Sequence, residues 1–498
     1  MIKPKIKVII SNMAWIDKST ISPVDLFQIK KPLYVMPKAM NNDGDQSIEM
    51  FRETPTHIGI PRVYFRMYFD VHDETYDISY DLCAGRRLPF NEKKITLRSV
   101  DQEPFVAEMV QSLTVGNWGC GIGEAYTGFG KSVVGIKIAE NLSINTLILV
   151  HNEEIKNVWQ QALKVFYPNA SVGLIQGAIC DYKKDFVIAM CQSLMTDEGK
   201  YPQEIYKTFG LVFVDEVHRF GARSFGNVAP RFNCKYIFGL TGTDRRKDDA
   251  EEVYHWVIGD VILKADETNR IKPIIYFRDT KIQMPSENVT FTNVKGEKVT
   301  RRKVISIGDW SRPDLLKYIC SDKNRLKLIA LDILHALKDH RHPLVVAERK
   351  EPLYEISKLV KAMVKGDPFF QKTVSHGFYF GSTDDKANAR LRLDAAGRCT
   401  IVYATLQKAK EGVDIVRLDT LFLVTPNTDT EQVIGRICRP TLKMIEGEPV
   451  NQPRVQPFVF DYVDCALSPC RSAFQQRHDL YKQRKWATMD LHTLDLRD

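Results

Sequence analysis

Residues 124–132 read EAYTGFGKS, with two glycines placed shortly before a lysine and a serine. Gly128 and Gly130 allow backbone N–H groups to close around phosphate oxygens. The Lys131 ammonium can reach the β- and γ-phosphates of a nucleotide, and the Ser132 hydroxyl is a ligand for Mg²⁺. A helix expected to begin near Lys131 points the positive end of its dipole at the same anion. The stretch predicts a nucleotide-binding loop; the alternative is a glycine-rich turn before a helix whose lysine is merely exposed.

The composition is that of a globular protein with a mild excess of positive charge. Hydrophobic residues make up 44% of the chain and charged residues 27%, and 498 residues are enough for about two to four domains. The net charge of +8 is a weak indication of a polyanionic partner. The ten cysteines include no CxxC pair, which indicates reduced thiols in a cytosol-like compartment. Because no apolar run approaches the ~18 residues of a membrane span, we expect a cytoplasmic protein without a membrane partner.

The chain changes character near residue 96. Residues 1–95 contain short β-type runs between turn-like clusters, which predicts a small β-rich accessory domain. Within it, the run RVYFRMYF at 62–69 is expected to be a strand. Its arginines and rings form either a nucleic-acid-binding surface that stacks bases and contacts phosphate, or a core with solvated arginines. Residues 97–113 predict a capped helix ahead of the loop.

Two series of strands alternating with helices follow, one over residues 96–265 and one over residues 266–465. Such alternation predicts parallel sheets flanked by helices, with ligands at the carboxyl ends of the strands. The expected strands of the first series lie at 145–151, 185–194, 211–220 and 235–243, and those of the second at 342–348, 377–383, 420–426 and 457–464, with a strand running into a loop at 399–414.

Two basic segments lie at the start of the second series and after it. Residues 266–310, at its start, are interpreted as a connector with an irregular segment, and the run KGEKVTRRK at 295–303 as an exposed loop or, alternatively, a nucleic-acid contact. Residues 466–498 are interpreted as a basic tail with a helical segment at 471–486, solvated on one face and packed through Phe474 and Tyr481.

An acidic pair, Asp215 and Glu216, follows four apolar residues in LVFVDEVH. A carboxylate at the end of a buried strand needs a compensating cation. In a protein with a phosphate loop that cation is Mg²⁺, held by Ser132 and Asp215, and Glu216 can then activate the attacking water.

Two further motifs are expected to respond to the nucleotide. Thr241 and Thr243 end the next strand, where hydroxyl groups can link hydrolysis to motion between domains. The run QVIGRICR places Arg436 and Arg439 on one helix face, and a guanidinium can stabilise the charge of a transferring phosphoryl group. Two solvated helix arginines are the alternative for that pair.

In this order, the motifs resemble those of superfamily 2 helicases and translocases. The resemblance covers about residues 97–465 and rests on TGFGKS, LILVHNEEIKNVW, CQSL, DEVH, GLTGT, ATLQKAKEGVD and QVIGRICR. Within the superfamily, the chain is similar to XPB-type, phage branch-migration and poxvirus-type transcript-release helicases. The resemblance implies an α/β fold with two tandem RecA-like domains, parallel sheets flanked by helices, behind a small β-rich N-terminal domain.

The resemblance also assigns expected roles to individual positions. The loop is expected to bind ATP and Mg²⁺, with Ser132 and Asp215 as metal ligands and with Gln102 as the residue that recognises adenine. Catalysis falls to Glu216 with Arg436 and Arg439. The remaining expected positions are loop residues Thr127, Gly128, Phe129, Gly130 and Lys131, nucleotide-sensing Gly412 and Asp414, domain-coupling Thr241, Thr243 and Gln432, and nucleic-acid-track residues Gln192, Ser193 and Thr405.

Some positions depart from the family pattern. Ala125 stands where the loop pattern begins with glycine, and Asp244 stands in the place of the usual proline after TGT. His151 and Asn152 replace the frequent Pro–Thr, and the run before Gln102 is one residue longer than usual.

These patterns predict an ATP-dependent helicase or translocase that unwinds or remodels branched or duplex DNA. An RNA-acting or transcription-terminating helicase with the same motor is the alternative, because contacts to the phosphate backbone need not read the 2′-hydroxyl. A scaffold with an inactive ATPase is disfavoured by the presence of Lys131, Asp215, Glu216 and Arg439. We expect a monomeric motor, alone or within a larger complex, in the host cytoplasm if the protein is viral or from a phage.

Overall fold

Alternate residues of the central strands pack into different hydrophobic cores on the two faces of their sheets. In strand β9 (Thr146–Val150), Leu147 and Leu149 belong to one core, and Ile148 and Val150 to another. Strand β19 (Pro343–Ala347) divides its side chains between two cores in the same way. Burial on both faces explains why these strands appear in the sequence as continuous apolar runs, and it is typical of parallel sheets covered by helices.

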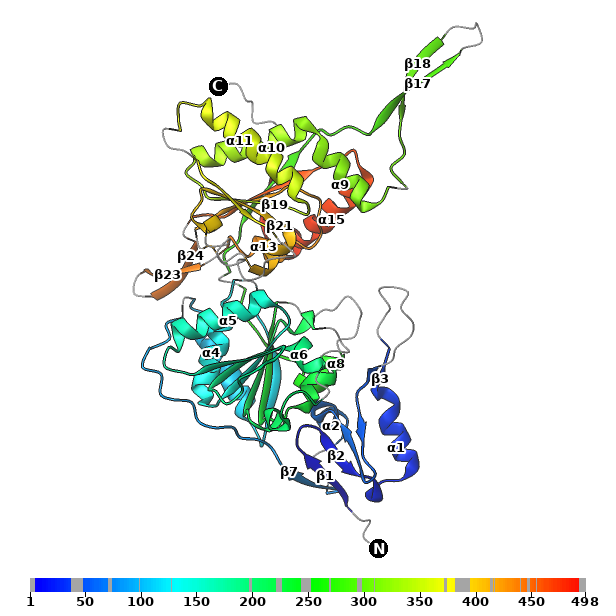
Figure 1. Ribbon diagram of the computed structural model, residues 1–498, viewed down its shortest axis with the longest axis vertical. Coiled ribbons are helices and arrows are strands. Elements are labelled where there is room, and N and C mark those ends of the chain that lie inside the picture. The colour runs from blue at the N-terminus through cyan, green and yellow to red at the C-terminus, as the bar shows by residue number, and fades with distance from the viewer. Residues whose placement is uncertain are drawn as a thin grey trace. The chain divides into compact units, whose positions relative to one another are not determined.

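The computed structural model describes residues 5–36, 48–69, 74–97, 99–126, 128–196, 199–220, 226–242, 252–267, 270–292, 298–308, 310–370, 374–380, 395–412, 415, 417–438, 440–445, 448–453 and 455–491. The chain forms two compact units (Figure 1). Unit 1 comprises Met1–Asn269 with Leu442–Val450, and unit 2 comprises Arg270–Thr441 with Asn451–Asp498.

The first part of unit 1 is a five-stranded sheet in the order β5-β6-β2-β1-β7. Its strands are β1 (Ile6–Ile10), β2 (Ala14–Asp17), β5 (Arg52–Glu53), β6 (His57–Ile60) and β7 (Tyr76–Tyr80). Helix α1 (Pro23–Lys30), the short pair β3 (Tyr34–Val35) and β4 (Ile48–Glu49), and helix α2 (Arg62–Tyr68) complete it.

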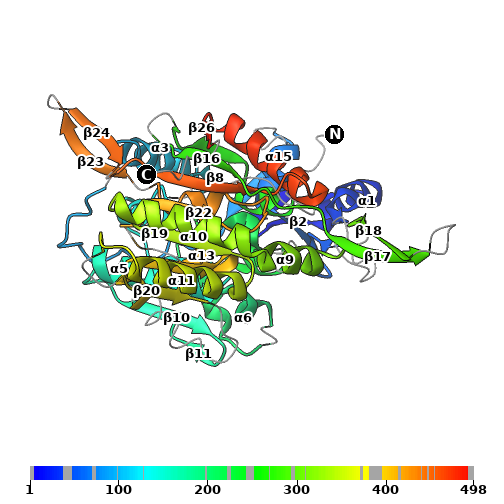
Figure 2. The ribbon, with the colours of Figure 1, turned by 90° about the horizontal axis from the view of Figure 1, so that it is seen from above.

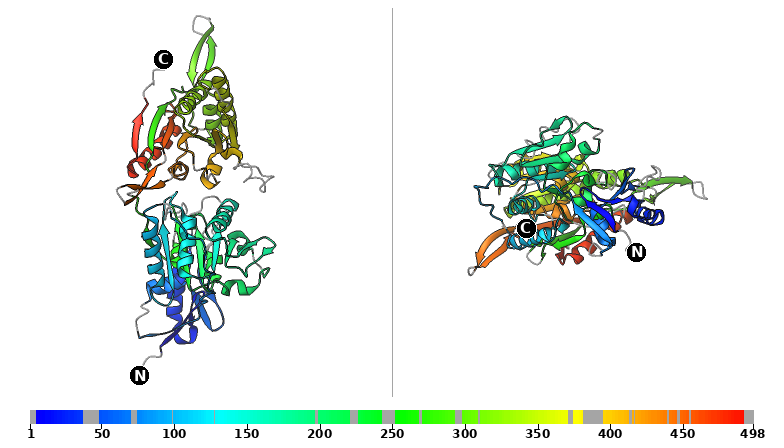
Figure 3. Two further views of the ribbon diagram at one scale, coloured as in Figure 1. Left: turned by 90° about the vertical axis from the view of Figure 1, so that its left-hand side faces the viewer. Right: turned by 90° about the horizontal axis from the view of Figure 1, so that it is seen from below.

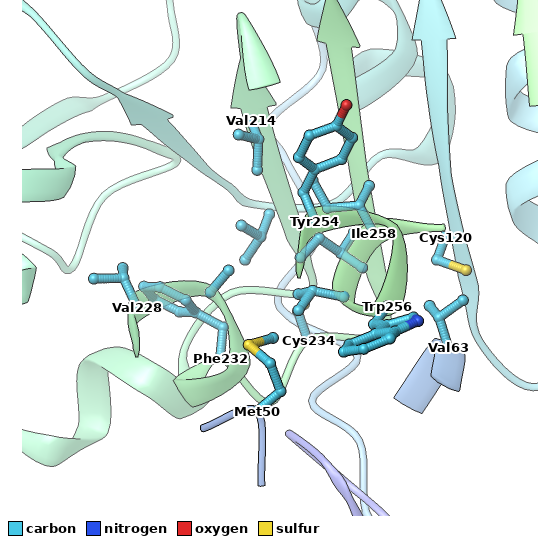
Figure 4. Close-up of a cluster of buried hydrophobic side chains, with 14 of the residues drawn as sticks. Met50, Val63, Cys120, Val214, Val228, Phe232, Cys234, Tyr254, Trp256 and Ile258 are labelled. Carbon is cyan, nitrogen blue, oxygen red and sulfur yellow. The ribbon is translucent and has the colours of Figure 1, made fainter. Parts of the chain in front are cut away.

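The prediction of a strand at 62–69 was wrong, because residues 62–68 form helix α2. Arg62, Val63, Tyr64 and Phe65 are buried, so packing overrides the β-propensity of the aromatic residues. Arg62 is not solvated: it is 4% exposed and donates to the Cys234 carbonyl at 2.8 Å. The helix packs against the following domain, as shown by Val63 beside Trp256 in Figure 4. Arg62 therefore links the two parts of unit 1.

The second part of unit 1 is an eight-stranded sheet in the order β11-β10-β12-β9-β13-β14-β8-β15, parallel except for β11. The further strands are β8 (Gly119–Glu124), β10 (Val172–Gln176), β11 (Ile179–Cys180), β12 (Phe186–Met190), β13 (Leu211–Asp215), β14 (Tyr236–Thr241) and β15 (Val261–Lys264). The helices are α3 (Gln102–Thr114), α4 (Lys131–Leu142), α5 (Glu153–Phe166), α6 (Cys191–Met195) and α8 (Glu252–Ile258).

Unit 2 contains a seven-stranded parallel sheet in the order β20-β21-β19-β22-β25-β16-β26 (Figure 2). The further strands are β16 (Ile274–Asp279), β20 (His376–Tyr379), β21 (Ile401–Thr405), β22 (Thr420–Leu423), β25 (Phe458–Val463) and β26 (Ala487–Asp490). The helices are α9 (Arg312–Ser321), α10 (Lys323–Lys338), α11 (Lys350–Lys365), α13 (Leu406–Gly412), α14 (Glu431–Ile434) and α15 (Ser468–Gln483). One hairpin, β17 (Ser286–Thr292) with β18 (Lys298–Val304), belongs to this unit. In a second hairpin, β23 (Pro440–Ile445) with β24 (Glu448–Pro453), residues Leu442–Val450 are grouped with unit 1.

The interpretation of residues 266–310 as an irregular connector was wrong. They include β16, a strand inside the sheet, and the β17–β18 hairpin, in which residues 298–303 of the basic run are paired rather than looped. Residues 466–498, interpreted as a tail, supply α15 and β26 of unit 2. Helix α15 is fixed by Arg477, which binds both oxygens of the Asp461 carboxylate at 2.7 and 2.8 Å. Among the described residues, no helix is long and apolar enough to cross a membrane.

Candidate active site

The phosphate loop joins the end of β8 to the first turn of α4. Gly128 and Gly130 have φ angles of +95° and +90°, which only glycine adopts without strain. Phe129 between them is 1% exposed and packs against Phe105 and Tyr126, at ring distances of 5.2 and 5.3 Å. This buried ring anchors the loop, and the Phe129 amide donates to the Tyr126 carbonyl at 3.1 Å. Thr127 lies outside the described residues.

Gln102 is tied to this loop through its side-chain amide. It is 1% exposed, its Nε2 donates to the Phe129 carbonyl, and its Oε1 accepts from the Ser99 amide at 3.1 Å. The amide thus bridges the start of α3 and the phosphate loop. The reading of adenine by Gln102 stays a prediction.

Lys131 and Glu216 form an ion pair next to the loop. Lys131 Nζ lies 2.7 Å from Glu216 Oε1 and 3.4 Å from the Ala125 carbonyl, and the two side chains are 12% and 18% exposed. Glu216 follows β13 in the left-handed conformation, with φ of +53°, which strains a residue other than glycine. Strain of this kind is concentrated at functional sites. The Glu216 carboxylate thus neutralises the Lys131 ammonium, and it occupies a position that a phosphate could take.

Asp215, the last residue of β13, is buried and only half satisfied. Its Oδ2 accepts a hydrogen bond of 2.7 Å from the indole Nε1 of Trp159, whereas its Oδ1 has no hydrogen-bond partner. Burial, and then the neighbouring Glu216 carboxylate, raise the pKa of Asp215 above its usual range, against the opposing effects of Lys131 and Trp159. An orphaned carboxylate oxygen of this kind fits a missing cation, and Ser132 stands in the first turn of α4. Groups of three or more His, Cys, Asp or Glu side chains able to hold a metal are absent from the described parts of the chain.

His218 links the acidic pair to the next strand. Its Nδ1 lies 2.6 Å from the hydroxyl of Thr241 at the end of β14, and 3.6 Å from Glu216 Oε2. The Gly242 amide also donates to Glu216 Oε2 at 3.4 Å. His218 Nδ1 thus lies between the Glu216 carboxylate and the Thr241 hydroxyl. The part of Thr241 in domain coupling stays a prediction. Thr243 lies outside the described residues.

Two side chains of this constellation, Trp159 and His218, were absent from the predicted site. Trp159 lies in the middle of α5, where the sequence shows only an amphipathic helix. The signal for His218 was its place two residues after Glu216 in DEVH. The indole contact depends on packing between helix and sheet, since the Trp159 ring also lies 4.8 Å from that of Phe213.

The predicted nucleic-acid-track residues of unit 1 make hydrogen bonds within that unit. Gln192 Nε2 donates to the His151 carbonyl at 2.7 Å, and Ser193 Oγ accepts from the Gly177 amide at 3.0 Å. These bonds fix the start of α6 next to strands β9 and β10. The part of the two residues in nucleic-acid binding stays a prediction.

In unit 2, Arg436 is held against α13. Its Nη2 donates to the carbonyl of Lys410, whose ammonium pairs with Asp429 at 2.9 Å. Gly412 is the last residue of α13, Gln432 lies on α14, and Thr405 ends β21. Arg439 and Asp414 lie outside the described residues. The structure thus places Arg436, Gln432 and Gly412 in one region of this unit.

Comparisons with known proteins relate this chain to helicases. Residues 94–246 match the family described as type III restriction enzyme, res subunit. A protein of Acanthamoeba polyphaga mimivirus named as an ATP-dependent RNA helicase, L396, is 26% identical over 484 residues, 95% of this chain and 84% of its own. A protein of Escherichia phage T5 named as helicase D10 is 23% identical over 404 residues, covering 80% and 78% of the two chains.

Two solved helicases are similar in structure. Bacteriophage T4 UvsW aligns over 98% of this chain and 100% of its own at 16% identity, with a TM-score of 0.37. The Hef helicase domain of Pyrococcus furiosus aligns over 76% and 98% at 14% identity, with a TM-score of 0.46.

The fold and the site, together with the sequence relatives, define an ATP-hydrolysing enzyme of the helicase class, with the α/β architecture of tandem RecA-like domains. More particularly, the chain is a relative of viral and phage superfamily 2 helicases, and proteins of that class bind nucleic acid.

Proposed function

We propose that this protein is an ATP-driven motor that unwinds or remodels branched or duplex DNA. The observation that carries the motor function is the constellation of Lys131, Asp215 and Glu216 around a glycine loop, in a chain related over its length to helicases. The preference for DNA rests on the similarity of its motifs to branch-migration helicases. RNA is a second candidate substrate, favoured by the name of the mimivirus relative.

In the proposed mechanism, the γ-phosphate displaces Glu216 from Lys131. The ammonium and the loop amides then bind the phosphates, and the freed Glu216 carboxylate becomes available to accept a proton from the attacking water. Asp215, through its unpartnered Oδ1, and Ser132 would hold Mg²⁺, which supplies neutralisation of the phosphate charge when bound. Arg436 and Arg439 are proposed to stabilise the transition state, and Gly412 and Asp414 to sense the nucleotide.

The contact of Glu216 with His218 is proposed to transmit the loss of the Lys131 pair to Thr241. Loss of the Lys131 pair alters the charge beside His218, which lies at 2.6 Å from the Thr241 hydroxyl. Thr241, Thr243 and Gln432 would then couple hydrolysis to movement between the domains. Alternating grip on the phosphate backbone, independent of sequence, moves the motor along one strand.

The substrate is tested by the rate of ATP hydrolysis with forked DNA, single-stranded DNA, duplex DNA and RNA. Stimulation of wild-type hydrolysis by forked DNA of at least about tenfold is expected, and Lys131→Ala should abolish hydrolysis under every condition because the phosphates lose their cation. Equal rates with every polymer and with none would contradict the motor. Stimulation by RNA alone would contradict the DNA preference and establish the second candidate. A single peak of about the chain mass on a sizing column would support a monomeric motor.

Trp159→Phe is expected to weaken Mg²⁺ binding roughly tenfold, since groups that orient a metal ligand typically contribute factors of ten or more. Phenylalanine keeps the ring that packs on Phe213 but removes the N–H that orients Asp215. The measurement is calorimetric titration of Mg²⁺ into the protein with ADP, beside the Mg²⁺ concentration for half-maximal hydrolysis. The matched control is Trp256→Phe on α8. An unchanged Mg²⁺ affinity in Trp159→Phe would show that the indole only fills space.

A further inference from the structure

The β17–β18 hairpin extends away from the sheet of unit 2 as an arm of two strands (Figure 3). It stands between β16 and α9, and its strands pair from Ser286 with Val304 to Thr292 with Lys298. An isolated two-stranded hairpin is marginally stable in water. Nearly all of its side chains are exposed, so the arm contributes little burial to the fold.

The root of the arm is fixed firmly in the unit. Ile282 on one side and Ile307 on the other are 4% and 5% exposed and belong to one small core with α9 and α15. The hydroxyl of Tyr318 donates to the Gln283 carbonyl at 3.0 Å, and the Ile305 amide donates to the Pro285 carbonyl at 2.8 Å. Movements of unit 2 are therefore passed to the arm.

The arm carries a strong excess of positive charge. Its described strands hold four cations, Lys298, Arg301, Arg302 and Lys303, against the single carboxylate of Glu287. Within the part of the chain that the structure describes, none of the four makes an ion pair, although Lys303 stands opposite Glu287 in the register. Exposed cations that form no ion pair are complementary to a polyanion.

One face of the arm combines charge with an aromatic ring. Because side chains alternate along a strand, Val289, Phe291, Arg301 and Lys303 point to the same face. Glu287, opposite Lys303, lies on this face too, which leaves it one net positive charge. Phe291 is 41% exposed, and the Arg301 guanidinium lies 5.3 Å from the centre of its ring. An exposed ring beside a guanidinium is a surface on which an unpaired base can stack, while a neighbouring cation binds phosphate.

We propose that the β17–β18 arm binds single-stranded DNA, with a base stacked on Phe291 and phosphates bound by Arg301 and Lys303. This inference rests on the proposed function and adds to it a contact outside the predicted motifs. Single-stranded DNA fits the face because paired bases in a duplex offer no free ring surface for Phe291. An arm fixed to unit 2 would hold a strand while that unit moves with the nucleotide cycle.

The test compares two variants that each remove two positive charges from unit 2. Arg301→Gln/Lys303→Gln changes the arm, and Lys361→Gln/Lys365→Gln changes exposed positions of α11. Affinity for a fluorescein-labelled 20-nucleotide DNA strand is measured by anisotropy over a range of salt concentrations. The arm variant is expected to bind about tenfold more weakly, with a salt slope smaller by about 1.4, from about 0.7 per phosphate contact. The α11 variant should match the wild type in both.

Phe291→Leu separates stacking from charge and from folding. Leucine keeps an apolar side chain in the strand but offers no ring, so single-strand affinity should fall about fivefold or more, with an unchanged salt slope. Circular dichroism and the melting temperature of each variant report the fold.

The outcomes distinguish the arm from the motor. A wild type that binds no polymer would contradict the proposed function itself. A wild type that binds DNA, with arm variants that bind as tightly, would overturn only the arm, as would an equal loss in the α11 variant. Loss of RNA binding with retained DNA binding would overturn the commitment to DNA.

Discussion

Replacing Glu216 with glutamine is expected to lower the rate of ATP hydrolysis by about 10²–10⁴-fold, the range typical for loss of a general base. Glutamine keeps the size of the side chain and its ability to accept the hydrogen bond from the Gly242 amide. It removes the charge that holds Lys131 at 2.7 Å, so the ammonium is free for phosphate before ATP arrives. ATP binding should therefore be retained or become a few-fold tighter.

The measurement pairs steady-state hydrolysis with the affinity for a fluorescent ATP analogue. Glu140→Gln is the matched control, because Glu140 also forms a lysine pair, at 2.7 Å with Lys137, on the same helix that Lys131 begins. It should change neither quantity by more than about twofold, as expected for a pair near the surface. A Glu216→Gln enzyme that hydrolyses ATP within about tenfold of the wild type would remove Glu216 from the role of base.

The parallel architecture was predictable because strands that are buried on both faces need apolar residues at nearly every position. Strands β9, β13 and β19 are continuous apolar runs, and each lies inside an expected range. Strand β8 was not predicted, because glycine is depleted in strands and its sequence GCGIGE contains three glycines. Its glycines are required by close packing: a Cβ at Gly119 would stand 1.9 Å from the Leu113 carbonyl oxygen, and one at Gly123 2.7 Å from Phe105 and Met109. This requirement comes from α3 and from neighbouring strands, so it cannot be inferred from β8 alone.

Site residues were predictable where the chemistry needs a local pattern. Gly128, Gly130 and Lys131 must be close in sequence to surround one phosphate, and Asp215 must end a buried strand to reach the same edge. Trp159 acts from another element, so its alignment with Asp215 depends on tertiary packing. Helix α2 was predicted as a strand because its aromatic residues favour a strand locally. Packing in the core that they share with Trp256 stabilises a helix instead.

Arg325→Met is expected to destabilise unit 2 by about 3–5 kcal/mol, the usual cost of leaving a buried carboxylate without its cation. Arg325 on α10 and Asp464 after β25 are both 0% exposed, and the guanidinium binds the two carboxylate oxygens at 2.8 and 3.1 Å. In the variant, Asp464 would keep only the hydroxyl of Thr280, at 2.6 Å. Scanning calorimetry should show the transition of this unit lowered by on the order of 10 °C, at about 2–4 °C per kcal/mol.

Two further variants separate the charge from the packing. Arg349→Met removes an exposed arginine, 3.9 Å from Glu351, and should shift the transition little, because surface pairs contribute about 0–1 kcal/mol. Arg325→Met/Asp464→Leu removes both buried charges, and it should recover most of the lost stability, since apolar replacements of a buried pair are often neutral. If the double variant is as unstable as Arg325→Met, the loss comes from the shape of the arginine and its bond to the Val424 carbonyl rather than from the unpaired carboxylate.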